Sequence, residues 1–76
     1  MICKIMMKDE KDVVRVSEEA AKAGIDMSVS CGYAMIDPRS ILGLFNFIGK
    51  EALLVAPDDL NPRYFERLVK RMGVAC

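Results

Sequence analysis

The chain has 76 residues, enough for one domain with a single hydrophobic core and too few for two. A hydrophobic content of 53% excludes a disordered chain, and the balance of 11 Lys+Arg against 11 Asp+Glu gives no overall attraction to nucleic acid or membranes. No apolar run is long enough to span a bilayer, and the N-terminal residues lack a signal-peptide layout, so we expect a cytoplasmic protein.

The first two elements expected in chain order are a strand over residues 2–7 and a helix that Gly24 ends. Apolar residues alternate along the strand, so that Cys3, Ile5 and Met7 share one face. Asp9 is a typical helix N-cap. Small and apolar side chains then recur at helical spacing and predict the buried stripe Val13, Val14, Ser17, Ala20 and Ala21. Glycine is the usual residue after the last turn of a helix.

A hairpin is expected next. Residues 26–31 alternate between apolar and polar side chains, which is typical of a half-buried strand. A tight turn at Cys31-Gly32 returns the chain as a paired strand over residues 33–36. The alternation predicts that Ala34 and Ile36 face inward while Tyr33 and Met35 face outward.

A short helix after Pro38 has more apolar residues than one buried stripe can use. Pro38 ends the preceding strand, and Ser40 is a good N-cap. One stripe is predicted to be buried and comprises Leu44, Phe47 and Ile48. The other comprises Ile41, Leu42 and Phe45, and an exposed apolar patch of this kind indicates a partner surface. The alternative is that loops or the last helix cover it.

The last two elements are a central strand over residues 52–56 and a helix that begins at Asn61-Pro62 and ends at Gly73. Leu60 and Phe65 are spaced as a hydrophobic staple. The expected core is Ile5, Val13, Ala20, Val29, Ile36, Leu44, Phe47, Leu54, Phe65, Leu68 and Met72, with Val69 also on the buried side of the last helix. The predicted order is β-α-β-β-α-β-α, in a single domain over residues 1–76.

No catalytic, metal or cofactor site is predicted. The chain has no histidine, and its three cysteines, Cys3, Cys31 and Cys76, lack metal-ligand spacing. Cys3 and Cys31 lie in apolar strand patterns and are expected to pack as small core residues, while Cys76 is expected to fray. The serines have no histidine to activate them, and no glycine-rich phosphate loop is present.

The element order and the segment Ile36-Asp37-Pro38-Arg39-Ser40-Ile41-Leu42-Gly43 resemble the HPr family, the histidine-containing phosphocarrier proteins of the bacterial sugar phosphotransferase system. That family typically shows Lys-Ser-Ile-Met-Gly at this place. The resemblance is best over residues 26–43 and covers the rest of the chain by pattern only. It implies an α+β open-faced sandwich, with an antiparallel four-stranded sheet in the order 1-4-2-3 and three helices on one face.

The resemblance also implies functional residues. Ser40 matches the regulatory serine that a dedicated kinase phosphorylates in many Gram-positive members. Ile41, Leu42 and Phe45 match the exposed apolar residues through which the family docks its partners, and we add Arg39 beside them. The implied partner is a protein, or a second copy of the chain, and neither nucleic acid nor a membrane is expected.

The departure from the family lies after the first strand. Members carry Gly-(apolar)-His-Ala-Arg-Pro there, and the histidine receives phosphate. Here the segment is Lys8-Asp9-Glu10-Lys11-Asp12-Val13, without histidine, arginine or proline. Asp9 is expected to cap the helix rather than accept phosphate, because Glu10 and Asp12 would repel a phosphate dianion. The chain is therefore not expected to be a conventional phosphocarrier.

One charge pattern remains on the last helix, where Arg63, Arg67, Lys70 and Arg71 fall on one side. It is interpreted as a solvated face whose cations suit the helix dipole, with an anion-binding or nucleic-acid-binding surface as the alternative. Three hypotheses of function follow. They are a regulatory protein-binding module of HPr type, a switch phosphorylated at Ser40, and an unrelated α/β domain that binds a ligand or oligomerises.

Overall fold

A computed structural model describes all 76 residues and contains four strands and three helices. In chain order these are β1 (Ile2–Met6), α1 (Glu10–Ala23), β2 (Ser28–Cys31), β3 (Ala34–Ile36), α2 (Ile41–Phe45), β4 (Glu51–Val55) and α3 (Pro62–Met72). The element order expected from the sequence is confirmed.

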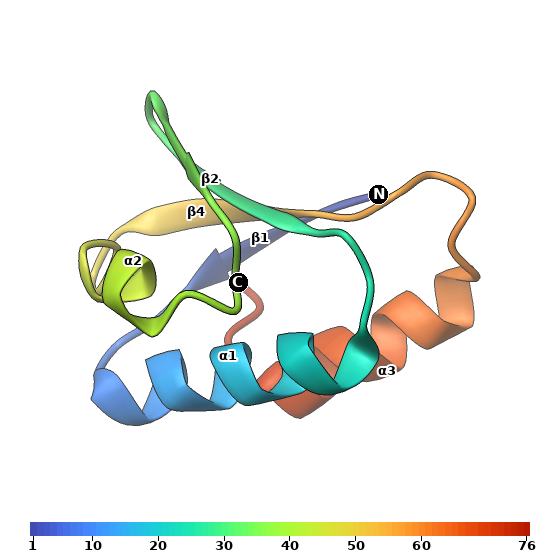
Figure 1. The fold of residues 1–76 in the computed structure, drawn as a ribbon, viewed down its shortest axis with the longest axis horizontal. Helices are drawn as coiled ribbons and strands as arrows, with labels where there is room; N and C mark the ends of the chain where they lie inside the picture. Colours follow the sequence, from blue (N-terminus) through green and yellow to red (C-terminus); the bar gives the residue numbers. More distant parts are fainter.

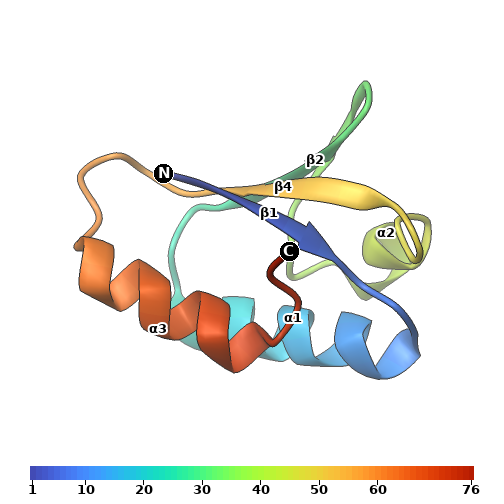
Figure 2. The same cartoon turned by 180° about the vertical axis from the view of Figure 1, so that it is seen from behind.

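The strands form one antiparallel sheet in the order β1-β4-β2-β3, with β4 central. In Figures 1 and 2, α1 and α3 lie side by side beneath the sheet, and α2 lies at one end of it. The other face carries no helix. The α+β class and the strand order are therefore as predicted.

Local signals in the sequence set the ends of the long helices. The Asp9 side chain accepts a hydrogen bond from the Asp12 N–H, and the Asn61 side chain accepts from the backbone N–H groups of the first turn of α3. Gly24 and Gly73 both have a positive φ, a left-handed conformation that closes a helix at little cost only for glycine.

The core lies between the sheet and the helices, and all but one of its eleven predicted members are buried. Ile36 is only half-buried because β3 is an edge strand. Two predictions of inward orientation were wrong, because Val14 and Ala21 on α1 are exposed. Ala34 on β3 shares the core-side face with Ile36, as predicted, but is exposed. The buried stripe of α1 instead follows i, i+3, i+4 and i+7 spacing and comprises Val13, Val16, Ser17 and Ala20. Ala34 lies at the hairpin end of the same edge strand.

The C-terminal residues are paired, which corrects the expectation that Cys76 frays. The Met6 N–H donates to the Val74 carbonyl, and the Cys76 N–H donates to the Lys4 carbonyl, each at 2.9 Å. Ala75 thereby bridges to Ile5 along the outer edge of β1. No helix of the chain has the length and apolar character needed to cross a membrane.

Candidate functional site

The turn that leads into α2 is held against α1. Pro38 is fully buried, and the buried Ser17 hydroxyl of α1 donates to the Arg39 carbonyl at 3.1 Å. The Ser40 N–H donates to the Asp37 carbonyl at 2.9 Å, which closes the turn. These contacts fix the position at which α2 begins.

Ser40 caps α2 as the sequence predicted. Its Oγ accepts from the Gly43 N–H at 3.3 Å, and its carbonyl accepts from the Leu44 N–H at 3.0 Å. Ser40 is exposed, so its hydroxyl is reachable from solvent. Gly43 faces β3, where a β-carbon would lie 2.9 Å from Cδ1 of Ile36. The glycine thus allows α2 to approach the edge strand closely.

The two apolar stripes are separated as predicted, although α2 ends at Phe45, so that Phe47 and Ile48 lie in the turn after the helix rather than on it. Leu44 and Phe47 are buried in the core and Ile48 is half-buried. On the other side Leu42 is 81% exposed, Ile41 40% and Phe45 38%. We call these three residues the α2 patch. Because neither loops nor α3 cover Leu42, the patch is an accessible apolar surface.

Arg39 lies beside the α2 patch but is already paired. Its Nη2 lies 2.7 Å from Oδ2 of Asp37, and its Nε donates to Oδ1 of the same carboxylate at 3.1 Å. These side-chain hydrogen bonds, with one from the Arg39 backbone, lower the pKa of Asp37 to about 2. The carboxylate therefore stays ionised at neutral pH and offsets the charge of Arg39.

The acidic segment after β1 makes a cap rather than a reactive centre. The Asp9 carboxylate accepts the Asp12 N–H at 3.1 Å, and Asp12 in turn accepts the Lys8 N–H at 2.8 Å. Both carboxylates are used to close the first turn of α1. This is the capping role predicted for Asp9.

The cysteines are free thiols. Cys3 and Cys31 are half-buried, less than their predicted core position implies, and Cys76 is exposed. Partial burial, with a smaller contribution from the Cys76 thiol, raises the pKa of Cys3. No group of three or more His, Cys, Asp or Glu side chains is placed to hold a metal ion.

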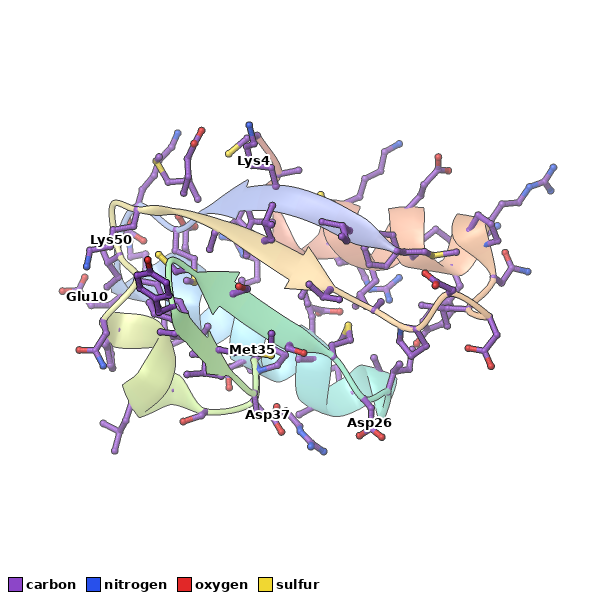
Figure 3. The ribbon with its side chains drawn as sticks, turned by 90° about the horizontal axis from the view of Figure 1, so that it is seen from above. Lys4, Glu10, Asp26, Met35, Asp37 and Lys50 are labelled. Carbon is purple, nitrogen blue, oxygen red and sulfur yellow. The ribbon has the colours of Figure 1, made fainter.

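A second apolar surface was missed by the sequence analysis. Ile2, Met35 and Leu53 are exposed on the open face of the sheet, where the register aligns Leu53 with Lys4 on one side and Ser30 on the other. Figure 3 looks onto this face, with Lys4 and Met35 labelled. The signal in the sequence was the uninterrupted apolar run of β4. Its alternate side chains necessarily reach both faces of the sheet.

Comparison with known proteins gives no further assignment, because neither a protein-family model nor a curated protein matches the chain.

Proposed function

We propose that this protein is a non-catalytic, HPr-like binding module that docks a cytoplasmic protein partner through the α2 patch. The observation that carries the proposal is the exposure of Leu42, Ile41 and Phe45 on a helix whose opposite side is buried. Exposed apolar side chains on a fixed scaffold lose little conformational entropy on binding and gain the free energy of burial. The strand order, which is the one that the resemblance to HPr implies, supports the same proposal.

A photo-crosslinking side chain in place of Leu42 tests the proposal. We expect irradiation in a native extract to give one dominant adduct, whose second component is identified by mass spectrometry. The same crosslinker in place of Met35, which is exposed on the sheet, is the control. An adduct with a second copy of the chain would identify a homodimer. Equal adducts from both positions, or none, would contradict docking through α2.

Phosphate transfer of the HPr type is not part of the proposal. The chain has no histidine, and the Asp9 carboxylate is occupied by the first turn of α1. We therefore expect phosphoenolpyruvate and the first enzyme of the phosphotransferase system to leave the protein unlabelled. Stoichiometric, acid-labile phosphate on the intact chain, detected by mass spectrometry, would be the contrary result.

Regulation through Ser40 is the second candidate function. Ser40 is exposed, begins α2 and is adjacent in sequence to Ile41 and Leu42 of the patch. A phosphate at a helix start is tolerated electrostatically, whereas its two negative charges oppose the docking of an apolar partner surface. We expect protein isolated from its native cells to carry phosphate on Ser40, as shown by phosphopeptide mapping. If Ser40 carries no phosphate under any growth condition, the protein is a binding module that is not regulated at Ser40.

A further inference from the structure

A groove of about 680 Å³ lies between the outer edge of β1 and α3, far from α2. Ile2, Phe65 and Val69 contribute apolar surface to it. Arg63, Arg67 and Lys70 contribute three cations, and Glu66 is the one acid. Figure 2 shows α3 beneath β1. Both elements run in the same direction, from the side where the chain's N-terminus lies, and α2 lies on the opposite side. We call this hollow the β1–α3 groove.

The three cations of the groove have no acidic partner. The five ion pairs of the structure involve the N-terminus, Arg15, Lys22, Arg39 and Arg71. Arg71, the remaining cation of α3, turns to α1 and binds Glu19 at 2.8 Å. Of the four cations of α3, Arg71 is thus held by α1, whereas Arg63, Arg67 and Lys70 line the groove without an acidic partner. Arg63 and Arg67 also line a second, smaller hollow next to Ile25 and Leu60.

The edge of β1 along the groove is free at its N-terminal end, before the part that pairs with the C-terminal segment. Met1 and Ala56 exchange backbone hydrogen bonds, so the alternation of an antiparallel ladder turns the polar groups of Ile2 and Lys4 away from β4. The C-terminal segment uses the Lys4 carbonyl and the Met6 N–H. Cys76 lies opposite Lys4 on this edge, so only the N–H and carbonyl of Ile2 remain available to a further strand.

We propose that the β1–α3 groove binds an extended acidic segment of a partner protein, which adds to β1 as a strand. The mode is β-augmentation, in which backbone hydrogen bonds supply affinity and alternate side chains supply specificity. Arg63 and Arg67 are separated by about 6 Å along α3, at about 1.5 Å per residue. Side chains on one face of a strand repeat every ~6.6 Å. Acidic residues at every second position therefore match the spacing of the two arginines.

The charge distribution favours a protein segment over a nucleic acid. Nucleic-acid surfaces use many cations along a phosphate backbone, whereas this groove has three, next to Glu66, in a chain of zero net charge. The apolar side chains and the open backbone edge are features that a peptide strand uses. This surface is separate from the α2 patch, so the inference does not depend on the proposed function.

The test measures binding of a fluorescein-labelled peptide of alternating Glu and Thr by fluorescence anisotropy at low ionic strength. A peptide of alternating Gln and Thr is the matched ligand control. We expect only the acidic peptide to bind, and added salt to weaken it. The double variant Arg67→Gln, Lys70→Gln should bind about three- to tenfold more weakly, since two exposed ion pairs are lost.

The matched control variant carries Lys11→Gln at the start of α1 and Lys50→Gln before β4. Both lysines are exposed and form no ion pair, and they lie at the α2 end of the molecule, where Figure 3 labels Glu10 and Lys50. It should bind as the wild type does. Equal weakening of both double variants, or equal binding of both peptides, would overturn the proposal. Tighter binding of single-stranded RNA, lost in the same α3 variant, would assign the groove to nucleic acid and overturn it as well.

Backbone NMR separates strand addition from simple attraction to the cations. On titration of the acidic peptide into the full chain, the amide signal of Ile2 should shift, because this N–H group would become a donor to the added strand. Signals of the hairpin between β2 and β3 should stay in place. Shifts confined to α3, with the Ile2 amide unchanged, would contradict β-augmentation.

Discussion

Replacing Leu68 by alanine should lower the free energy of unfolding by about 2–5 kcal/mol, which is the usual cost of deleting a buried leucine side chain. Leu68 has no exposed surface and lies in the core between α3 and the sheet. A domain of this size has only about 4–11 kcal/mol of stability in total. The single substitution therefore removes a large fraction of it.

Urea denaturation followed by circular dichroism measures this loss. Arg67→Ala, at the neighbouring exposed position of the same helix, is the control and should change stability by less than about 0.5 kcal/mol. Phe65→Ala, also at a buried position, should resemble Leu68→Ala. A loss below ~1 kcal/mol in both buried variants would mean that α3 does not pack on the core with this face.

Strong local signals made most of the fold predictable. Ser40, Asn61, Gly24 and Gly73 determine helix ends through contacts within a few residues, and the structure has each of them in the predicted role. The error on α1 has a simple cause. Val13 and Val14 are both apolar, and the helical period alone does not say which of the two faces the core. The contacts of α1 with α2 and α3 make Val13 the inner one.

The strand order followed from the resemblance to HPr, but the pairing of the C-terminal segment was not predictable from the sequence. The segment 74–76 is too short to show a strand pattern, and its pairing with β1 depends on where α3 ends in space. The β1–α3 groove likewise depends on how distant segments of the chain pack together. The sequence places Arg63, Arg67 and Lys70 on one side of a helix, which is typical of a solvated face. Only the tertiary arrangement brings the free edge of β1 beside them.

The residues of the α2 patch were predictable, but whether another part of the chain covers them was not. Six apolar residues between positions 41 and 48 exceed what one buried stripe uses, and this excess was visible in the sequence. Whether the second stripe remained uncovered depended on the path of the turn through Pro38 and on Gly43, which lets the helix approach Ile36. The exposed fraction also differs among the three residues of the patch, and Leu42, the most exposed, is the one whose substitution tests binding with the least effect on folding.

Leu42→Asp should abolish the complex that the α2 patch forms while leaving the domain folded. The substitution removes an apolar side chain from the interface, and the new carboxylate loses its hydration when the partner covers it. For a central interface residue this corresponds to at least 2 kcal/mol, or about a thirtyfold loss of affinity. Because Leu42 is 81% exposed in the free protein, the free energy of unfolding should change by less than about 0.5 kcal/mol.

The measurement is titration calorimetry with the crosslinked partner, or sedimentation velocity if the partner is a second copy. Met35→Asp introduces the same charge at another exposed apolar position and should leave binding unchanged. Phe45→Asp should also prevent binding, but with some loss of thermal stability, because more than half of Phe45 is covered by the fold. If Leu42→Asp binds with the affinity of the wild type, the partner surface lies elsewhere on the molecule. If Leu42→Asp unfolds the domain, the residue belongs to the core, and the argument for docking through α2 fails with it.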